Sequence, residues 1–392
     1  MKTSSLMLAG SPAFTFVLMM GVVNLFGDMT YAGGASINGP FLGTLGAAAV
    51  AISIIGGLSE FLGYTVRSVA GYLADKTGRY WLVTFIGYAL NLFLVPAMAL
   101  SGNWQIAGAL ILAQGIGRGI RKPTVAAMLS YSTGRHGKGR VYAVNAALDQ
   151  TGATVGPLFM ALALFLNASY QTGYALLLIS ACLAIASLVA ARVVFPVPSR
   201  LEQPGEKTAQ ADRFTASYWL YVVAGACFAA GLSTIALIAY HLSHSGTVPR
   251  PWIPLFLAVA TGIAALTSLL IGWLYDRIGI WVVLGAVCLT AVFPPLVFLG
   301  GFNVALLGMV FWGVGEATER TLLSAIIVGV LPKGRRNLAF GLFYLGFGGG
   351  FLVGGVTMGL LYDYSRALLS AFAVAAMLAS VPFFLLAARR QS

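Results

Sequence analysis

The chain has 392 residues, of which 59% are hydrophobic and only 9% are charged. A soluble domain carries about 25% charged residues, so this composition excludes an ordinary soluble protein, and it also excludes a disordered one. The net charge of +12, from 23 Lys and Arg against 11 Asp and Glu, would favour a nucleic-acid partner in a soluble protein. In a membrane protein the same excess reports orientation. We therefore expect the lipid bilayer as the surroundings and no nucleic acid.

Hydrophobic runs of roughly 20 to 28 residues follow one another along the chain, and about 20 apolar residues are what a helix needs to cross a bilayer. Helix is the expected structure, because a spanning segment must satisfy its backbone hydrogen bonds internally. The sequence thus predicts an all-α membrane protein with twelve transmembrane helices in two six-helix halves. In chain order, the predicted spans are residues 12–37, 46–70, 81–101, 104–130, 141–166, 170–194, 217–242, 253–273, 281–300, 304–331, 338–361 and 367–388.

The longest polar stretch divides the chain near its middle. It predicts a cytoplasmic linker at residues 196–216, between an N-terminal half at 1–195 and a C-terminal half at 217–392. Most Lys and Arg residues fall in segments on the same side as the two termini, and loops rich in basic residues stay in the cytoplasm. We expect a monomeric multi-pass protein of the plasma (inner) membrane with both termini cytoplasmic.

Two loops about 200 residues apart echo each other, as expected for an internal repeat. Each loop contains glycines, which allow a sharp turn. Each also contains an acid and a basic residue, which can stabilise a helix end or form an ion pair. We interpret the loops as a conformational latch, and the alternative is a topogenic loop with ordinary helix capping. The residues are Gly71, Asp75, Gly78 and Arg79 in the first loop, and Gly272, Asp276 and Arg277 in the second.

The segment from Gly71 to Arg79 resembles the signature loop of the major facilitator superfamily. Gly152, Gly156 and Pro157 on the fifth span are similar to the Gly-x-x-x-Gly-Pro motif of its antiporters, although small residues also serve plain helix packing. The resemblance covers essentially the whole chain and points to the drug/proton antiporter-like branch. It implies a transporter rather than an enzyme. It also implies a small-molecule substrate and a central cavity lined by the first and fourth helices of each half.

Charged residues inside the spans are costly and usually face a cavity or a partner. We predict Asp28, Glu60 and Asp149 as candidates for binding the coupling proton, because burial of an acid in apolar surroundings disfavours its charged form. From its position in the span, Asp28 is expected in the outer third of the membrane. The alternative is a structural ion pair inside one half, such as Glu60 with Arg118.

The fourth and tenth spans carry opposite charges at equivalent positions of the repeat. Arg118 and Arg121 stand on one, and Glu316 and Glu319 on the other. We predict all four as cavity residues, with Arg118 and Glu316 communicating across the cavity. The alternative for Arg121 is a role at the cytoplasmic helix end, together with Lys122 and paired with Asp75. Further cavity candidates, for which packing is the alternative, are Tyr31, Trp312 and Tyr344.

Together these features predict a secondary active transporter that works by alternating access and exports a small, moderately apolar compound in exchange for protons. One alternative is a proton-coupled importer of an organic anion or metabolite, with Arg118 and Arg121 as the anion site. The alternative from another class is a membrane sensor that transports nothing. Cys182, Cys227 and Cys288 lie in apolar spans and are expected to pack there, so we expect no metal site and no cofactor.

Overall fold

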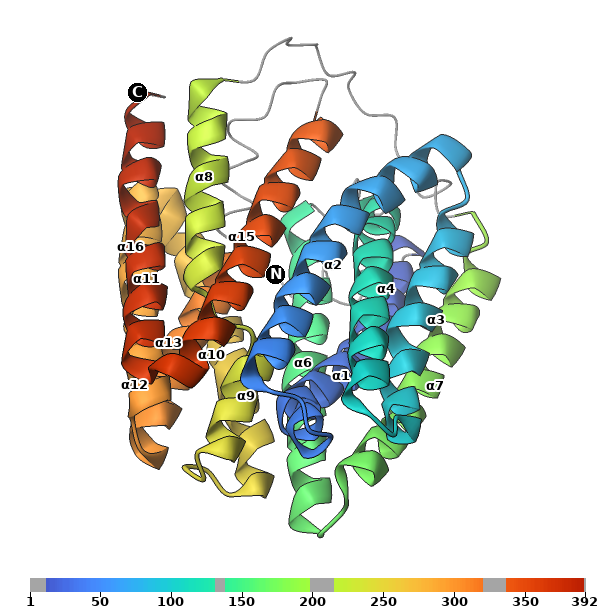
Figure 1. Ribbon diagram of the computed structural model, residues 1–392. Helices are drawn as coiled ribbons and strands as arrows, with labels where there is room; N and C mark the ends of the chain where they lie inside the picture. Colours follow the sequence, from blue (N-terminus) through green and yellow to red (C-terminus); the bar gives the residue numbers. More distant parts are fainter. Residues whose placement is uncertain (1–11, 131–137, 198–214, 320–335, 391–392) are drawn as a thin grey trace, which may run out of the picture.

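Long helices run between the two ends of the molecule and pack side by side (Figure 1). The computed structural model describes residues 12–130, 138–197, 215–319 and 336–390, without the side chains of 75, 138–143, 276 and 336–340. Over these ranges the chain is helical and contains no strand. The prediction of an all-α membrane protein is confirmed, with twelve crossings in two halves.

The crossings of the first half follow one another with short connections. They are α1 (Pro12–Thr44), α2 (Ala49–Thr77), α3 (Tyr80–Ala97) continued by the 3-10 helix η1 (Met98–Leu100), α4 (Trp104–Ser130), α6 (Lys138–Phe165) and α7 (Tyr170–Val194). In the second half two crossings are each built from two helices. Its elements are α8 (Ala216–Gly231) with α9 (Ile235–His244), η3 (Arg250–Trp252), α10 (Ile253–Ile278), α11 (Ile280–Thr290) with α12 (Phe293–Leu299), α13 (Phe302–Ala317), α15 (Arg336–Tyr364) and α16 (Arg366–Arg389).

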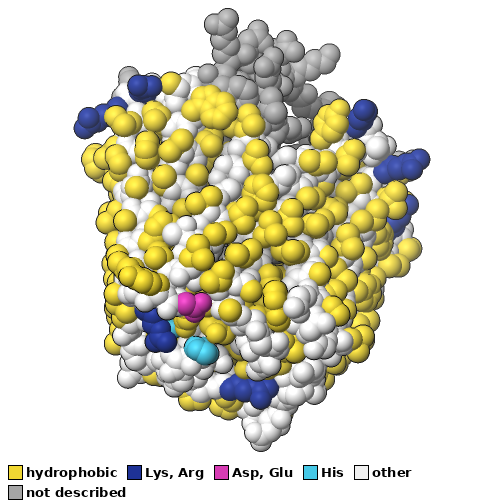
Figure 2. Space-filling view, in the orientation of Figure 1, with side chains coloured by type: hydrophobic (Ala, Val, Ile, Leu, Met, Phe, Trp, Pro, Cys, Tyr) yellow, Lys and Arg dark blue, Asp and Glu magenta, His cyan; other side chains and the backbone are white. Residues whose placement is uncertain are grey.

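Nine segments of the described chain are long and apolar enough to cross a membrane. The other crossings are α4 and α6, which carry charged residues, and α13, whose described part has 16 residues. Figure 2 shows hydrophobic side chains spread over the face in view, with Lys and Arg side chains near its two ends. This pattern suits a surface that lies in lipid. Cys182 and Cys288 are exposed rather than packed, which corrects the expectation for these two.

Several helix boundaries differ from the predicted spans; α2 and α10, for example, end at Thr77 and Ile278 rather than at residues 70 and 273. α1 continues to Thr44, past the predicted end at residue 37, because polar residues such as Asn38 are buried inside the protein. The seventh span breaks after Leu232, whose backbone is extended (φ −81°, ψ 101°). The ninth span breaks before α12, which begins with Phe293 and two prolines. Proline has no backbone N–H to donate to the preceding turn.

Glycines bring corresponding pairs of helices into close contact in the two halves. A Cβ atom on Gly156 of α6 would collide with the carbonyl oxygen of Met29 on α1. In the second half, a Cβ atom on Gly354 of α15 would collide with the carbonyl oxygen of Ala230 on α8. Close backbone approach is the usual way for membrane helices to gain packing energy. Each half therefore has the same glycine-mediated helix contact, which we call its seam. In the first half Gly152 extends the seam by packing against Leu25.

Candidate functional site

A cavity of about 890 Å³ lies between the two halves. Its wall takes residues from α1, α2, α4 and α6 of the first half and from α9, α10, α13 and α15 of the second. At the end of the molecule away from the C-terminus the halves touch, since a Cβ atom on Gly39 of α1 would collide with the carbonyl oxygen of Ala236 on α9. Nine of the predicted site residues line the wall: Asp28, Tyr31, Glu60, Arg118, Asp149, Trp312, Glu316, Glu319 and Tyr344.

Arg118 forms an ion pair with Glu60 of its own half. Its Nη2 donates to the Glu60 carboxylate, and the two side chains are 16% and 20% exposed. The guanidinium also lies 4.9 Å from the ring centroid of Tyr31. Glu316 lies close enough to Arg118 to act on it electrostatically. The ion-pair partner is nevertheless Glu60, because α2 and α4 pack tightly where Gly115 meets Ser59.

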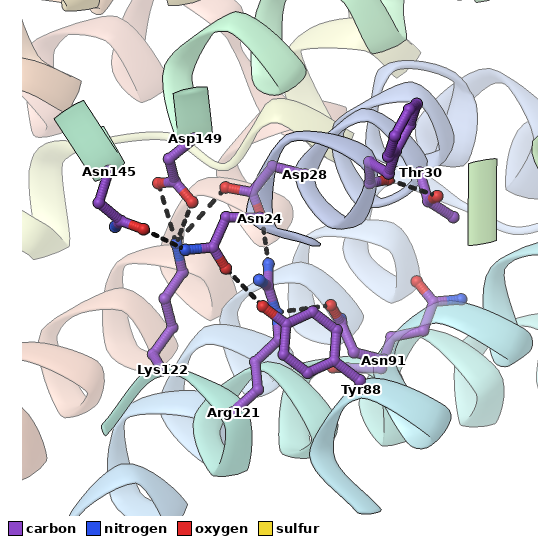
Figure 3. Close-up of polar contacts among 11 residues, drawn as sticks. Asn24, Asp28, Thr30, Tyr88, Asn91, Arg121, Lys122, Asn145 and Asp149 are labelled. Carbon is purple, nitrogen blue, oxygen red and sulfur yellow. Dashed lines mark hydrogen bonds and ion pairs between the residues drawn. The ribbon is translucent and has the colours of Figure 1, made fainter. Parts of the chain in front are cut away.

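A second group of charges lies where α1, α4 and α6 meet (Figure 3). Arg121 donates through Nη2 to Asp28, and it is only 1% exposed. Lys122 lies between two carboxylates, with its Nζ 3.4 Å from Asp28 Oδ2 and 3.1 Å from Asp149 Oδ2. Two positive and two negative charges therefore neutralise one another inside the first half. A buried charge is tolerated when it is paired in this way.

Neutral polar side chains complete this charged cluster, which we define as Asp28, Arg121, Lys122 and Asp149. Arg121 Nε donates to Asn91 Oδ1 at 3.0 Å, and its guanidinium lies 5.1 Å from the ring centroid of Tyr88. The Tyr88 hydroxyl donates to Asn24, whose amide donates to Asn145 at 2.8 Å. These residues were not predicted. The signal available was the presence of Asn24, Asn91 and Asn145 inside or beside apolar spans.

The charged cluster corrects two predicted placements. Asp28 lies at the level of Arg121 and Lys122 rather than in the outer third, because α1 runs to Thr44 and Asp28 is then at its middle. Arg121 does not line the central cavity, because it turns toward Asp28 and Asn91. The partners found for Arg121 and Lys122 are Asp28 and Asp149 rather than Asp75, whose side chain lies outside the described part of the chain.

A contact between the halves lies on the opposite wall of the cavity. The Tyr64 hydroxyl of α2 donates to the carboxylate of Glu319, which follows α13 in a short π-helical segment. The rings of Tyr64 and Tyr344 stack with centroids 5.5 Å apart. Arg67 lies 4.8 Å from the centroid of the first ring and 4.9 Å from that of the second. Sequence reasoning singled out Tyr344 and Glu319 but not their partner Tyr64.

Trp312 is buried, and its ring nitrogen donates to the backbone oxygen of Ser233 at 3.0 Å. Ser233 lies in the break between α8 and α9, where its carbonyl group has left the helical pattern. Trp312 therefore holds the broken helix in place while it lines the cavity. Trp312 thus both packs against the helix break and lines the cavity.

The two loops that the sequence predicts as latches share a backbone feature. Gly78 ends α2 with φ +65°, and Gly279 ends α10 with φ +60°, a region that favours glycine. Arg277 stacks on Trp273, with 3.8 Å between the guanidinium carbon and the ring centroid. Gly71 packs near Pro123 of α4, and Gly272 is half-buried. Arg79 is exposed beside Gly78, and the side chain of Asp276, like that of Asp75, lies outside the described residues.

Among the described residues, no group of three or more His, Cys, Asp and Glu side chains could hold a metal ion. The acids of the site are engaged with Arg, Lys and Tyr side chains instead. The chemistry that this arrangement allows is ion pairing, proton binding and ligand stacking.

Comparison with known proteins agrees with this geometry. The chain matches the sequence model of the Major Facilitator Superfamily over residues 15–318 and 225–392. It is 32% identical over 360 residues to an uncharacterised protein of Mycobacterium tuberculosis, covering 90% of this chain and 88% of that protein. An uncharacterised MFS-type transporter of Methanocaldococcus jannaschii is 27% identical over 187 residues, which are 47% of this chain and 45% of that one.

Solved structures give the same fold. The crystal structure of the nucleoside transporter NupG superposes with a TM-score of 0.73 at 13% identity, over 94% of this chain and 99% of that one. The crystal structure of the peptide transporter POT in complex with sulfate gives a TM-score of 0.73 at 15% identity, over 95% and 94% of the two chains. The chain therefore belongs to the Major Facilitator Superfamily, and it is a membrane transporter of that kind.

Proposed function

We propose that this protein is a proton-coupled secondary transporter of the drug/proton antiporter-like branch. It exports a small, moderately apolar compound by alternating access. The proposal specifies the direction, the coupling ion and the substrate class of the transporter. The observation that carries the substrate class is that Arg118 and Arg121 are both paired with acids of their own half; the direction and the coupling ion rest on the resemblance to the antiporters.

These ion pairs bear directly on the substrate class. An importer of organic anions needs a cationic group that can meet the substrate, and Arg118 and Arg121 were the predicted ones. Glu60 and Asp28 already hold the places at these guanidinium groups that a substrate carboxylate would take. An incoming anion would have to displace a buried carboxylate, which leaves that carboxylate unpaired at high cost. A neutral or weakly basic compound meets no such obstacle.

The cavity also suits an apolar ligand in size and lining. Its volume of about 890 Å³ lies within the roughly 300–1,000 Å³ of small-molecule sites. Aromatic rings from both halves line it, including Tyr31, Trp312 and Phe347. Such rings bury large apolar area and stack on flat ligands. The acids Glu316 and Glu319 on the second half add negative charge that suits a basic group on the compound.

The proposal includes the arrangement in the membrane. The two halves at 1–195 and 217–392 move about the linker at 196–216, as a monomer in the plasma membrane with both termini in the cytoplasm. The end where Gly39 meets Ala236 is then the outer end, and it is closed. The loops after α2 and α10 act as latches, with Gly78 and Gly279 as their sharp turns. Asp75→Asn should therefore reduce transport strongly while the protein stays folded.

A ligand screen followed by flux measurements tests the proposal. Purified protein is screened by thermal shift with neutral, basic and acidic compounds, and each stabilising compound is then assayed in proteoliposomes with an imposed pH gradient. Accumulation in vesicles with an acidic lumen supports antiport with protons. Accumulation only when the outside is acidic contradicts it and indicates proton-coupled import. Absence of flux for every stabilising compound also contradicts it and favours the sensor.

A second candidate, import of an organic anion, has one observation in its favour. Arg67 and Arg118 both line the cavity, and the Nε atom of each is buried without a hydrogen-bond partner among the described residues. A carboxylate that bridged these two donors would satisfy both. In that case acidic compounds would give the largest thermal shifts in the screen, and Arg67→Met would abolish those shifts.

A further inference from the structure

A second, smaller pocket of about 140 Å³ lies beside the charged cluster. Asn24 of α1 and Asn145 of α6 line it together with Arg121, Lys122 and Asp149. Its remaining lining comes from the part of α4 that follows Lys122, and there Ala126 is exposed at the protein surface. The pocket therefore extends from the cluster toward the end of α4 and is separate from the main cavity.

Lys122 and Asp149 line both spaces, the central cavity and the small pocket. Asp28 lines only the cavity, and Arg121 lines only the pocket. The ion pair between Lys122 and Asp149 thus stands between the two spaces. A group in the pocket that alters this ion pair therefore also alters the wall of the cavity.

The two acids of the cluster are not equally compensated. Asp28 has Arg121 and Lys122 as cationic partners and is 7% exposed. Asp149 has an ion pair with Lys122 alone, which it shares with Asp28, and it is 16% exposed. An acid with fewer cationic partners gains less from being ionised. Asp149 is therefore the less well compensated of the two acids.

Charged and titratable groups surround Asp149 from several elements. Asp28 faces it from α1, Arg121 and Lys122 face it from α4, and Tyr88 lies near it on α3. α10 also packs against α6, but it meets the neighbouring Gln150 through the backbone oxygen of Thr261. The balance between the ionised and the protonated form of Asp149 thus depends on one neighbouring acid and on two bases that stay charged.

The small pocket has the polarity and the room to hold water. A cavity needs only about 10–15 Å³ of this kind of volume to hold one water molecule, so the 140 Å³ of the pocket leaves room for several. Arg121 contributes to the pocket, and its Nη1 is buried without a hydrogen-bond partner among the described residues. The amide groups of Asn24 and Asn145 offer further hydrogen bonds.

We propose that this pocket is a hydrated access route through which Asp149 exchanges protons with the solvent, without passage of those protons through the substrate cavity. The inference rests on the proposed function and names its proton site. A hydronium ion in the pocket gives its proton to the Asp149 carboxylate, which becomes a neutral carboxylic acid, and a water molecule remains. Lys122 then keeps only Asp28 as its ionised partner, and the ion pair between pocket and cavity is broken. Proton binding from one space thereby changes the wall of the other.

Infrared difference spectroscopy of the purified protein tests the site, and its probe is the proton itself. Acidification should produce the band of a neutral carboxylic acid in the wild type. The band should be lost in Asp149→Asn and shifted in frequency in Asp149→Glu. In Asp28→Asn it should remain but appear at lower pH, because Lys122 then pairs with Asp149 alone. The Glu variant retains an acid and so covers the case in which the Asn variant does not fold. Loss of the band in Asp28→Asn alone, or no pH-dependent band at all, would overturn the proposal.

The route is tested by the rate at which this band shifts when the solvent is changed from H₂O to D₂O. Ala126→Phe places a large side chain at the pocket and should slow the exchange about tenfold, which corresponds to a barrier raised by about 1.4 kcal/mol. The matched control is Ala127→Phe, one residue along α4 and not part of the pocket. Equal rates in the two variants would exclude this route.

These measurements need no substrate, so they separate the site from the proposed function. If the band is assigned to Asp149 but the protein transports nothing under any gradient, coupling to transport is rejected and the proton site is retained. Proton-driven flux that persists in Asp149→Asn would leave the transporter standing and reject this site.

Discussion

α4 and α13 hold equivalent places in the two halves, and they are alike in their glycines but opposite in their charges. Gly115 brings α4 against Ser59 of α2, and Gly313 brings α13 against Ala260 of α10, in each case at a place where a Cβ atom would collide with the neighbouring backbone. Three residues further on, α4 carries Arg118 and α13 carries Glu316.

The partners of these charges also differ. The basic residues of α4 bind acids of their own half, as in the pairs of Arg118 with Glu60 and Arg121 with Asp28. Glu319, beyond the end of α13, accepts a hydrogen bond from Tyr64 of the other half. Shape is thus shared between the halves because both must bring helix backbones close together. The charges of these two regions are used differently: those of α4 stabilise the first half itself, and Glu319 beyond α13 joins the halves.

The largest effect should follow from removal of a charge inside the first half. Arg121→Met leaves two carboxylates, Asp28 and Asp149, with Lys122 as their shared cation, and a buried charge that loses its partner costs about 3–5 kcal/mol. Chemical unfolding in mixed detergent measures this loss of stability. Glu319→Gln is the matched change in the second half and should cost much less. Similar losses for the two variants would remove the distinction between the halves.

The close backbone contacts should be equally sensitive in both halves. Gly156→Ala and Gly354→Ala each force a methyl group against a carbonyl oxygen, and such overpacking costs about 1–3 kcal/mol. Gly349 is the control, because a Cβ atom there meets nothing within 4 Å, so Gly349→Ala should stay within about 0.5 kcal/mol of the wild type. Thermal unfolding of the three variants compares the seams. A loss confined to one half would mean that the glycine pattern is not a shared requirement.

Coupling energies sharpen the comparison at the cavity wall. Contacting residues couple by about 0.5–3 kcal/mol in a double-mutant cycle, so Arg118 and Glu60 should fall in this range. Arg118 and Glu316, which interact without a direct ion pair, should couple by less than Arg118 and Glu60 do. Both cycles are measured on stability, with the single variants Arg118→Met, Glu60→Gln and Glu316→Gln. The reverse order would restore the pairing across the cavity that the sequence predicted.

Much of the fold was predictable from the sequence, because bilayer thickness and backbone hydrogen bonding leave few alternatives to a series of apolar helices. The breaks at Leu232 and before Phe293 were not predicted. A hydropathy pattern does not reveal a helix break inside a buried apolar stretch. The extra residues of α1 up to Thr44 were missed because Asn38 and its neighbours look like a helix end, although they are buried.

The site was predictable as a set of residues but less so as a set of pairs. The cost of charge in the membrane singled out Asp28, Glu60, Asp149 and Arg118, and all four line the cavity. Which charges pair depends on the rotation of each helix and on its level in the membrane, and an error of seven residues at the end of α1 is enough to misplace Asp28. Tyr64 was overlooked because an aromatic residue in an apolar span carries no signal that it reaches the other half.

The smallest effect on overall stability should come from the contact that joins the halves. Tyr64→Phe removes the hydrogen bond to Glu319 and keeps the stacked ring against Tyr344. A hydrogen bond to a charged group contributes about 1.5–3 kcal/mol, so the balance between closed and open arrangements should shift about tenfold or more while overall stability hardly changes. Spin labels at the exposed residues Ser130 and Ile278 report the distance between the halves, in a background with the native cysteines replaced by serine. Tyr72→Phe is the control, because Tyr72 is an exposed tyrosine on the same helix. A distance distribution that is the same in both variants would mean that Tyr64 and Glu319 do not hold the halves together, and charge on the second half would then have to serve the substrate.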